Sequence, residues 1–593
     1  MAAPVRQLLR MIPRRRRGQL VLIGGLMPLA ALAELVTISA LIPLLALLTN
    51  ASIGKGASWM ARLVAQIGMR TGTEPMVTAA GLFALAAILA AVLRLILSWA
   101  TQRFAYGLGH DWMVEIQRRI LLQPYAFHLQ RNSSQIVAAL AKVERLVFSV
   151  VLQLLQTASA LIMSLFIVAA LLMIDATSAA IAALFVASVY AAGLLAIRGR
   201  LAGNSNVIGE SYERRIQTVQ ESLGGIRDII LDHSQAPYVE AFRSIDERFM
   251  RAAASSAFIS SAPRFVIEAL GLLLLVGVAI VLSERTGGLA NALPVLGALA
   301  LAAQRLLPLT QTLYNGWTTL AAEQAIVADV VELLTLPVAV AKESPPGPPI
   351  AFAREIRFDQ VGFHYPGRAA AAVGGIDLVI PRGERIALIG RTGAGKSTLA
   401  DLLMGLLEPG TGHITIDGVV LNHASVRAWQ KNVAHVPQAI FLADGSIARN
   451  IAFGEPAQAI DLARVDHAAS VAQLVDFIAT LPEGYETMVG ERGVRLSGGQ
   501  RQRLGVARAV YKGASVLILD EATSALDEET EEALMGALDR LGAEGRTILI
   551  VAHRKTTIRS CDRIVRLDHG RIVETGSYEQ LFGPREPRPG EST

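Results

Sequence analysis

Residues 385–398 read RIALIGRTGAGKST and decide the fold of the second half of the chain. A short apolar run leads into a glycine-rich loop with the spacing G-x-x-x-x-G-K-S. Glycines in such a loop let backbone N–H groups surround phosphate oxygens, while the lysine reaches the outer phosphates and the hydroxyl binds Mg²⁺. The pattern predicts a strand, a phosphate-binding loop and the start of a helix in an α/β domain. The expected phosphate contacts come from Gly390, Arg391, Thr392, Gly393, Ala394, Gly395, Lys396, Ser397 and Thr398.

A second apolar run, VLILDEATSALD at residues 516–527, ends in two adjacent acids. A carboxylate at the end of a strand beside a phosphate loop suits a metal ligand, and we assign that role to Asp520 together with Ser397. Glu521 is then placed to polarise an attacking water. These residues predict a site that hydrolyses a nucleoside triphosphate.

Further along the same half, LSGGQ at residues 496–500 opens a helical stretch. The exposed N–H groups at a helix start form an anion site, although a serine there can also act as a simple N-cap. The residues concerned are Ser497, Gly498, Gly499 and Gln500.

In this combination and order, the motifs resemble those of an ABC transporter half-unit of the exporter type, and the resemblance covers essentially the whole chain. It implies ATP and Mg²⁺ as cofactors. It also implies an adenine-stacking role for Tyr365, contact of Gln438 with metal and water, and contact of His553 with the γ-phosphate. Asp527 would end the D-loop, and VGERG at 489–493 resembles the x-loop of exporters.

The same resemblance implies that the LSGGQ segment completes the ATP site of a second copy. Since the chain holds one phosphate loop and one LSGGQ segment, we expect a symmetric homodimer. Coupling helices that transmit motion to the membrane are expected near residues 124–134 and 224–234.

The composition predicts a membrane protein. The chain has 593 residues, of which 52% are hydrophobic and 18% charged. Its single cysteine excludes a disulfide framework, and its basic residues form no stripe apart from the apolar runs, which argues against nucleic-acid binding. Residues 1–330 hold 27 Lys/Arg against 18 Asp/Glu, whereas the remainder is mildly acidic.

Six apolar runs are long enough to cross a bilayer. They lie near residues 19–48, 76–93, 146–174, 176–197, 265–283 and 286–307. The fold class is therefore an all-α membrane domain of six helices with cytoplasmic extensions, followed by an α/β ATPase domain. We expect the membrane domain at residues 1–325, a proline-rich linker at 326–353, the ATPase at 354–582 and a disordered tail at 583–593.

Basic residues set the orientation. Six arginines precede the first run, and the two long connections are rich in Lys/Arg, so the amino terminus and the ATPase half are expected in the cytoplasm. The resemblance to exporters implies the inner membrane of a bacterium. The segment 58–69 has the spacing of a short amphipathic helix, which fits either the outer membrane surface or a cap on the bundle.

Charged residues inside apolar runs are costly and commonly face protein or water. Arg94, Arg264 and Arg305 therefore could line a cavity for phosphate groups. In the structural alternative, Glu34 and Glu268 pair with Arg94 and Arg305, and Arg264 and Arg305 simply lie at the membrane interface.

A narrower resemblance, carried by SAPRFVIEALG at 261–271, the glycine pair at 224–225 and the helix at 58–69, is to lipid-linked oligosaccharide flippases. It implies a polyprenyl-pyrophosphate glycan as substrate. The alternatives are a lipid A, phospholipid or hydrophobic-drug exporter and, from another class, a membrane-anchored regulatory ATPase.

Overall fold

The computed structural model describes residues 2–49, 58–174, 176–285, 289–338, 350–367, 370–490, 493–521, 528–552 and 554–583. The chain divides into two compact units. One comprises Met1–Gln123 and His128–Val338, and the other comprises Pro124–Phe127 and Ala339–Thr593. The short segment Pro124–Phe127 thus groups with the second unit, although its neighbours on both sides belong to the first.

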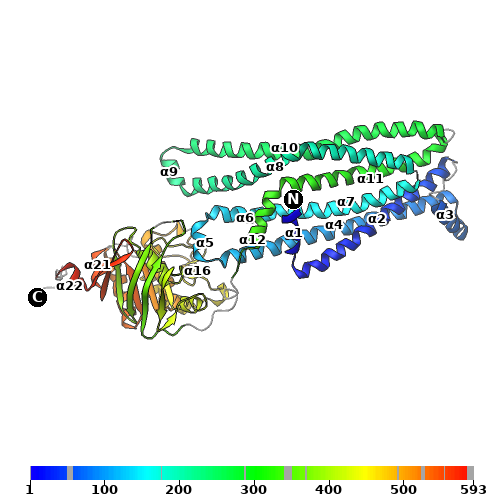
Figure 1. The fold of residues 1–593 in the computed structure, drawn as a ribbon. Coiled ribbons are helices and arrows are strands. Elements are labelled where there is room, and N and C mark those ends of the chain that lie inside the picture. Colours follow the sequence, from blue (N-terminus) through cyan, green and yellow to red (C-terminus); the bar gives the residue numbers. More distant parts are fainter. Residues whose placement is uncertain are drawn as a thin grey trace. The chain divides into compact units, whose positions relative to one another are not determined.

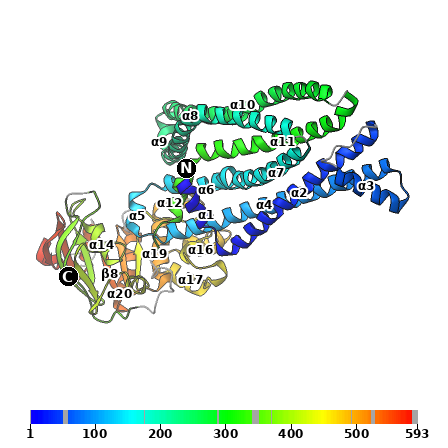
Figure 2. The ribbon, with the colours of Figure 1, turned by 45° about the vertical axis from the view of Figure 1, so that its right-hand side comes forward.

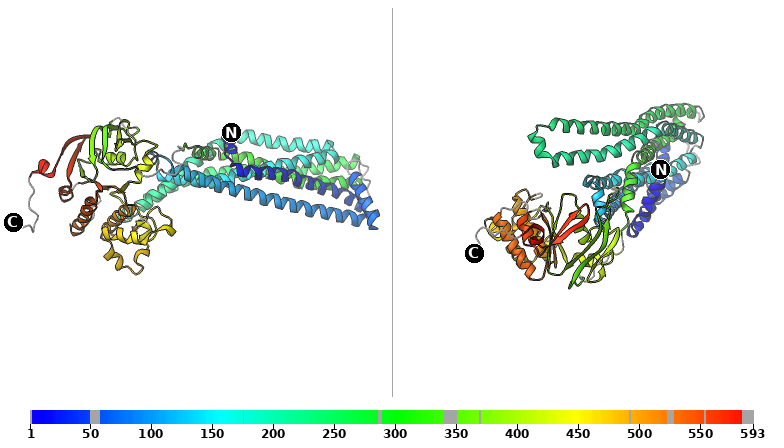
Figure 3. Two further views of the ribbon diagram at one scale, coloured as in Figure 1. Left: turned by 90° about the horizontal axis from the view of Figure 1, so that it is seen from below. Right: turned by 60° about the vertical axis from the view of Figure 1, so that its left-hand side comes forward.

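The first unit is a bundle of long helices that lie side by side in perpendicular views (Figures 1 and 3). Alanine and leucine, both strong helix formers, dominate these segments. The long helices are α2 (Arg14–Thr49), α4 (Pro75–Leu121), α7 (Leu152–Ile174), α8 (Ala176–Gly224), α10 (Gln235–Arg285) and α11 (Leu289–Ala322). Shorter ones are α1 (Ala2–Arg10), α3 (Ser58–Thr71), α5 (Tyr125–Gln130), α6 (Ser133–Arg145), α9 (Ile226–Leu231) and α12 (Gln324–Leu334).

Four helical stretches among the described residues are long and apolar enough to cross a membrane. They are Arg14–Leu48, Pro75–Leu121, Ser134–Leu172 and Gln235–Leu273. The predicted spans at 176–197 and 286–307 fall in α8 and α11, apart from residues 286–288, which lie outside the described residues, as does Asp175 between α7 and α8. A helical membrane unit is confirmed, and the count of six spans stays a prediction.

Helices α3 and α9 lie at opposite ends of this unit (Figures 1 and 2). In α3, Met60 and Val64 are buried while Met69 is 80% exposed. Helix α3 therefore packs one side on its own bundle and leaves the other side open, so both sequence interpretations of the 58–69 segment retain support.

An ion cluster around a buried lysine joins three helices of the first unit. Lys142 of α6 is buried, and its Nζ lies 2.5 Å from Glu213 of α8 and 2.6 Å from Asp329 of α12. One turn further along α6, Arg145 lies 2.6 Å from Glu323. A π-helix (Leu146–Val151) follows directly, so the regular α-helical pattern changes beside this cluster.

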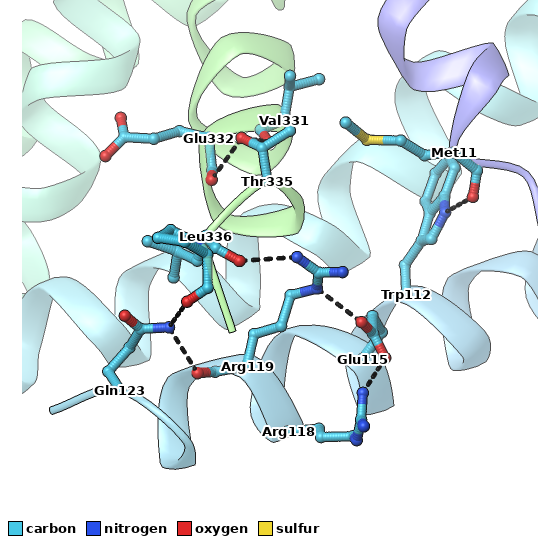
Figure 4. A network of polar contacts seen from close by, with 11 residues as sticks. Met11, Trp112, Glu115, Arg118, Arg119, Gln123, Val331, Glu332, Thr335 and Leu336 are labelled. Carbon is cyan, nitrogen blue, oxygen red and sulfur yellow. Dashed lines mark hydrogen bonds and ion pairs between the residues drawn. The ribbon is translucent and has the colours of Figure 1, made fainter. Parts of the chain in front are cut away.

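Helix α12 occupies part of the segment expected as linker from residue 326. Its Ile326 and Val330 side chains are buried against the bundle, which explains why the helix stays in the first unit. Beyond its end, Arg119 of α4 donates to the Leu336 carbonyl at 2.7 Å and Gln123 donates to the Pro337 carbonyl at 3.0 Å (Figure 4). The chain leaves the bundle only after these anchors.

The second unit contains two sheets. The smaller has the order β2-β1-β4-β5 and is antiparallel, with β1 (Glu355–Phe363), β2 (Val373–Pro381), β4 (Thr411–Ile416) and β5 (Val419–Val420). The larger has the order β10-β9-β3-β8-β7-β6. Its strands are β3 (Arg385–Ile389), β6 (Val433–Val436), β7 (Val516–Asp520), β8 (Thr547–Val551), β9 (Arg563–Asp568) and β10 (Arg571–Gly576), all parallel neighbours except the β9–β10 pair.

Alternate residues of the larger sheet enter two separate cores. Leu388 and Ile518 face α14 (Lys396–Leu403) and the smaller sheet. Ile389 and Leu519 face the core that contains α19 (Gly498–Lys512) and α20 (Glu528–Ala543), which are labelled with α14 in Figure 2. The same core takes in α16 (Ile447–Ile451) and α17 (Leu462–Val471). Strands buried on both faces explain the continuous apolar runs in the sequence.

Candidate functional site

The glycine loop has the predicted strand–loop–helix form. It follows β3 and ends where α14 begins at Lys396. Gly390, Gly393 and Gly395 all have positive φ, at 150°, 82° and 101°. A Cβ at Gly390 would lie 2.3 Å from the Leu567 carbonyl oxygen, so this position accepts no larger residue without movement.

Lys396 is folded onto its own loop. Its Nζ donates to the carbonyls of Gly390 at 2.8 Å and Arg391 at 3.1 Å. Burial lowers the pKa of Lys396, and the nearby Glu521 and Asp520 carboxylates oppose that shift. The ammonium group is therefore close both to the loop and to the two acids.

The two acids lie at the end of β7, a buried strand between β6 and β8. Asp520 is the last residue of the strand and pairs in register with Val551. Glu521 follows in a left-handed conformation, with φ of 49°, and its N–H donates to the Val551 carbonyl at 3.1 Å. This conformation is uncommon for a residue with a Cβ and marks Glu521 as a strained position at the end of the strand.

Gln438 reaches the same point from β6, the neighbouring strand of the sheet. Its Nε2 donates to Glu521 Oε2 at 2.6 Å. The structure thus brings together Lys396, Asp520, Glu521 and Gln438, four residues that the sequence assigned to one site.

Tyr365 lies beside Thr398 of α14. Its hydroxyl is 3.2 Å from Thr398 Oγ1, and its ring meets Phe363 edge-on at 5.0 Å between centroids.

Asp401, one turn beyond Thr398, is a residue that the sequence motifs do not include. Burial, followed by the Asp520 charge, raises the pKa of Asp401 to about 6.

The LSGGQ segment forms the start of α19, with Ser497 as its N-cap. Ser497 Oγ accepts from Gln500 N at 3.2 Å, and Gln500 Oε1 accepts from Ser497 N at 2.8 Å. This capping box is the N-cap role that the sequence allowed for Ser497. The helix start is nevertheless open to solvent, since Ser497 is exposed and Gly498 and Gly499 are partly exposed.

Some predicted residues fall outside the described part of the chain. They are His553, the D-loop residue Asp527, and Glu491 and Arg492 of the VGERG segment. Their roles stay predictions.

Sequence reasoning missed a buried polar contact that holds the segment following Gln438. Asn450 is fully buried and exchanges hydrogen bonds with the backbone of Ala443, each at 3.0 Å. Arg508 of α19 donates to the carbonyls of Phe441 and Asn450, each at 3.0 Å, and burial lowers the pKa of Arg508 to about 10. An arginine inside the apolar LGVARAV run was the available signal.

The residues present fit a Mg²⁺ ion bound with nucleotide. Among the described residues, no group of three or more His, Cys, Asp or Glu side chains could hold a metal. Mg²⁺ needs no such cage, since it takes one or two protein oxygens together with phosphates and water. The Ser397 hydroxyl, the Asp520 carboxylate and the Gln438 side-chain oxygen are donors of the kind it prefers.

In the membrane unit, the three arginines of the expected substrate cavity each lie beside a carboxylate. Glu34 Oε1 is 2.9 Å from Arg305 Nε, and its Oε2 is 3.7 Å from Arg94 Nε. The structural alternative predicted a pair between Glu268 and Arg305. Instead, Glu268 Oε1 lies 2.7 Å from Arg264 Nε on the same helix. Glu34 is 1% exposed, so one buried carboxylate serves two arginines from different helices.

The matches to known proteins fall in the same two parts of the chain, the helical unit and the ATPase unit. Residues 39–287 match the family described as "ABC transporter transmembrane region", and residues 373–524 match "ABC transporter". The solved structure of a bacterial Atm1-family ABC exporter with ATP bound covers 96% of this chain and 96% of its own, with a TM-score of 0.71 and 26% identity. The chain belongs to the ABC transporters.

This ABC transporter is of the exporter half-transporter type, with a membrane region fused to an ATPase domain. Similar curated proteins include ATP-dependent lipid A-core flippases. That of Cupriavidus metallidurans is 38% identical over 62% of this chain, and that of Thiobacillus denitrificans is 35% identical over 65%. The aligned stretch spans 61% and 66% of those relatives, respectively.

Proposed function

We propose that this chain is one half of an ATP-driven exporter that moves an amphipathic, phosphate-bearing lipid, of the lipid A-core class, from the cytoplasmic to the outer leaflet of a bacterial inner membrane. The observation that carries the proposal is the fusion, in one chain, of an apolar helical unit with an ATPase unit whose acids, lysine and glutamine converge. Transport driven by nucleotide turnover is the activity that uses both units.

The ATPase roles are those predicted from the sequence, and the convergence of Lys396, Asp520, Glu521 and Gln438 supports them. Residues 390–398 would hold the phosphates, with Lys396 supplying the positive charge and Tyr365 stacking on the base. Asp520, Ser397 and Gln438 would hold Mg²⁺, which neutralises phosphate charge when bound. Glu521 would orient the attacking water, and His553 would contact the terminal phosphate.

A second copy of the chain is part of the proposal. The start of α19 presents backbone N–H groups at an exposed helix N-terminus, which suits an anion, so Ser497, Gly498, Gly499 and Gln500 would complete the site of the partner. Helix α9 and its flank also expose a cluster of apolar side chains suited to a protein surface: Leu223 (65%), Ile226 (46%), Ile230 (56%) and Leu231 (74%).

The substrate class rests on the relatives and on the arginines. Arg94 and Arg305 are each 35% exposed at the side chain, although both lie beside Glu34. An arginine retains donors after one ion pair, and a phosphate can take them in a bidentate manner. We infer that Glu34 holds the two arginines in position until an anionic headgroup binds them beside Glu34 or in its place. Arg264 forms an exposed ion pair with Glu268 of its own helix, α10, and contributes less to binding of the headgroup.

The test is a flipping assay in proteoliposomes. ATP-dependent movement of fluorescent lipid A is expected, and it is expected to be absent in Glu521→Gln. Movement of a polyprenyl-pyrophosphate glycan alone would favour the substrate first expected from sequence, and movement of a neutral hydrophobic dye would favour a drug exporter. ATP turnover without movement of any of them would favour a regulatory ATPase.

A second measurement separates the two roles of the arginines. In Glu34→Gln the carboxylate charge is lost while the shape is kept. If the arginines bind phosphate, affinity for lipid A should rise, since a competitor has been removed. If they are only structural partners of Glu34, thermal stability should fall with no gain in affinity.

A further inference from the structure

The arginine cluster at the start of α2 is divided into two sets by the fold. Arg16 turns toward the bundle, where its Nε donates to Asp111 at 2.8 Å and its Nη2 donates to the Gly107 carbonyl at 3.1 Å. Arg14, Arg15 and Arg17 are exposed. Arg16 is therefore the arginine of this cluster whose hydrogen bonds join α2 to α4.

The exposed arginines continue into an apolar face of the same helix. Val21 is 76% exposed and Leu22 is 60% exposed. Arg14 precedes Val21 by seven residues and Arg15 precedes Leu22 by seven, so two helical turns bring each pair to the same side.

This face stays open further along α2. Leu29 and Leu32 are 52% and 46% exposed. A Cβ built on Gly18 or Gly25 would meet nothing within 4 Å. The exposed side of α2 is thus an apolar strip with positive charge at one end.

The corner between α1 and α2 is firmly held by the bundle. Leu8 and Ile12 are buried, and the Trp112 indole N–H donates to the Met11 carbonyl at 3.5 Å (Figure 4). Arg17 donates to the Ile12 carbonyl at 3.2 Å. The arginines are consequently presented by a folded corner, which lowers the entropy lost when they bind a ligand.

We propose that Arg14, Arg15 and Arg17 bind the phosphate of an anionic phospholipid in the leaflet next to the start of α2, with its acyl chains along the apolar strip. The chemistry matches at both ends, since arginine recognises phosphate and the strip is suited to hydrocarbon. The site is separate from Arg94 and Arg305, which face Glu34 inside the bundle. The inference rests on the proposed membrane placement of α2 but not on transport.

The experiment is a lipid titration of the purified full chain in detergent at low ionic strength, without nucleotide. Native mass spectrometry counts bound short-chain phosphatidylglycerol. The triple variant Arg14→Gln, Arg15→Gln, Arg17→Gln should lose roughly a hundredfold in affinity, because each basic residue at an anionic surface contributes about fivefold. A matched control replaces three exposed arginines of α10, Arg243, Arg248 and Arg251, by glutamine, and should bind as the unmodified chain does.

Two further probes separate the contributions. Short-chain phosphatidylcholine carries the same tails without net charge, and glycerol phosphate carries the phosphate without tails; both should bind more weakly than phosphatidylglycerol. If the triple variant fails to fold, Arg14→Gln with Arg15→Gln leaves the Arg17 contact in place and should lose about 25-fold.

The proposal is overturned if the triple variant retains phosphatidylglycerol affinity, or if the α10 control loses as much, since the effect would then be one of total charge. Equal binding of phosphatidylcholine would also overturn it. Because no nucleotide is added, a chain that binds lipid here but moves none in proteoliposomes would count against the proposed function alone.

Discussion

Gln438 donates a hydrogen bond to Glu521, with 2.6 Å between Nε2 and Oε2. The two residues are 83 positions apart and follow adjacent strands, β6 and β7. The same glutamine is expected to bind metal and water, and the same glutamate is expected to orient the water. The contact therefore joins the element that would sense the metal to the element that would drive hydrolysis.

Replacing Glu521 by glutamine should slow ATP hydrolysis by about 10²–10⁴-fold, because a positioned general base contributes that much and an amide cannot accept the proton. Phosphate release from the reconstituted transporter measures it. ATP affinity should be unchanged, since Lys396 and the glycine loop remain. The matched control is Glu544→Gln, at an exposed carboxylate beyond the end of α20, which should hydrolyse normally. Normal turnover in Glu521→Gln would contradict the assigned role.

The hydrogen bond itself can be tested with a double-mutant cycle. Gln438→Ala, Glu521→Ala and the double variant are compared by chemical unfolding without nucleotide. The two losses should be non-additive by about 0.5–1.5 kcal/mol, the usual net value of a partly exposed hydrogen bond. Additive losses would mean that the contact contributes nothing in solution. A cycle between Gln438 and the distant Glu544 provides the control and should be additive.

Much of the ATPase site could be predicted from sequence because its signals are local. The glycine loop needs positive φ at fixed positions, and Gly393 and Gly395 supply it where the pattern predicts. The capping box at Ser497 and Gln500 is likewise encoded within four residues. Such features depend on neighbours in the chain, so no knowledge of the fold is needed to find them.

Contacts between distant segments could not be predicted in the same way. The sequence offered Glu34 and Glu268 as partners for the membrane arginines, but which helices face each other decided that Glu34 takes both Arg94 and Arg305. The linker is a similar case. Prolines near residue 345 pointed to an extended segment, whereas burial of Ile326 and Val330 keeps the preceding residues helical.

Asp401 predicts a pH-dependent stability for the ATPase unit. Its pKa is raised from 3.8 to about 6, so the folded state binds the proton more tightly than the unfolded state. Its contribution to stability is thus present at low pH and is lost as pH rises from about 4 to 6. Asp401→Asn should remove this loss of stability, because the asparagine amide does not ionise as pH rises. Thermal unfolding without nucleotide should show a Tm higher by about 2–4 °C above pH 7, with no difference below about pH 4.

The control for Asp401 is a carboxylate whose pKa moves the other way. Backbone N–H groups of Ala353, Arg354 and Glu355 bind Asp417, and although burial alone would raise its pKa, these bonds lower it. Asp417→Asn should therefore lower Tm at neutral pH. An equal Tm for Asp401→Asn and the unmodified chain across the whole pH range would show that Asp401 is not held in the buried environment described.

Lys142 is expected to be the most sensitive ion-pair residue of the membrane unit. Its side chain is 3% exposed, and it separates the carboxylates of Glu213 and Asp329. Lys142→Met keeps the length and removes the charge, which leaves two acids facing each other. Losing one partner of a buried pair costs about 3–5 kcal/mol, and because both acids are over 40% exposed and can regain water, we expect a smaller loss, about 1–3 kcal/mol. Thermal unfolding in detergent measures it.

The matched control is Arg243→Met, which breaks an exposed ion pair with Glu240 on the same helix and should change stability by less than about 0.5 kcal/mol. Because each variant removes one cation, a difference between their stability losses reports the burial of Lys142 and not the loss of charge.

Lys142 also ties α12 to α6 and α8, and α12 leads toward the ATPase unit in the sequence. Lys142→Met should for that reason weaken the stimulation of ATP turnover by lipid more than it weakens basal turnover. Equal effects on both rates, or a stability loss no larger than that of Arg243→Met, would show that the cluster neither holds the three helices together nor carries a signal between them.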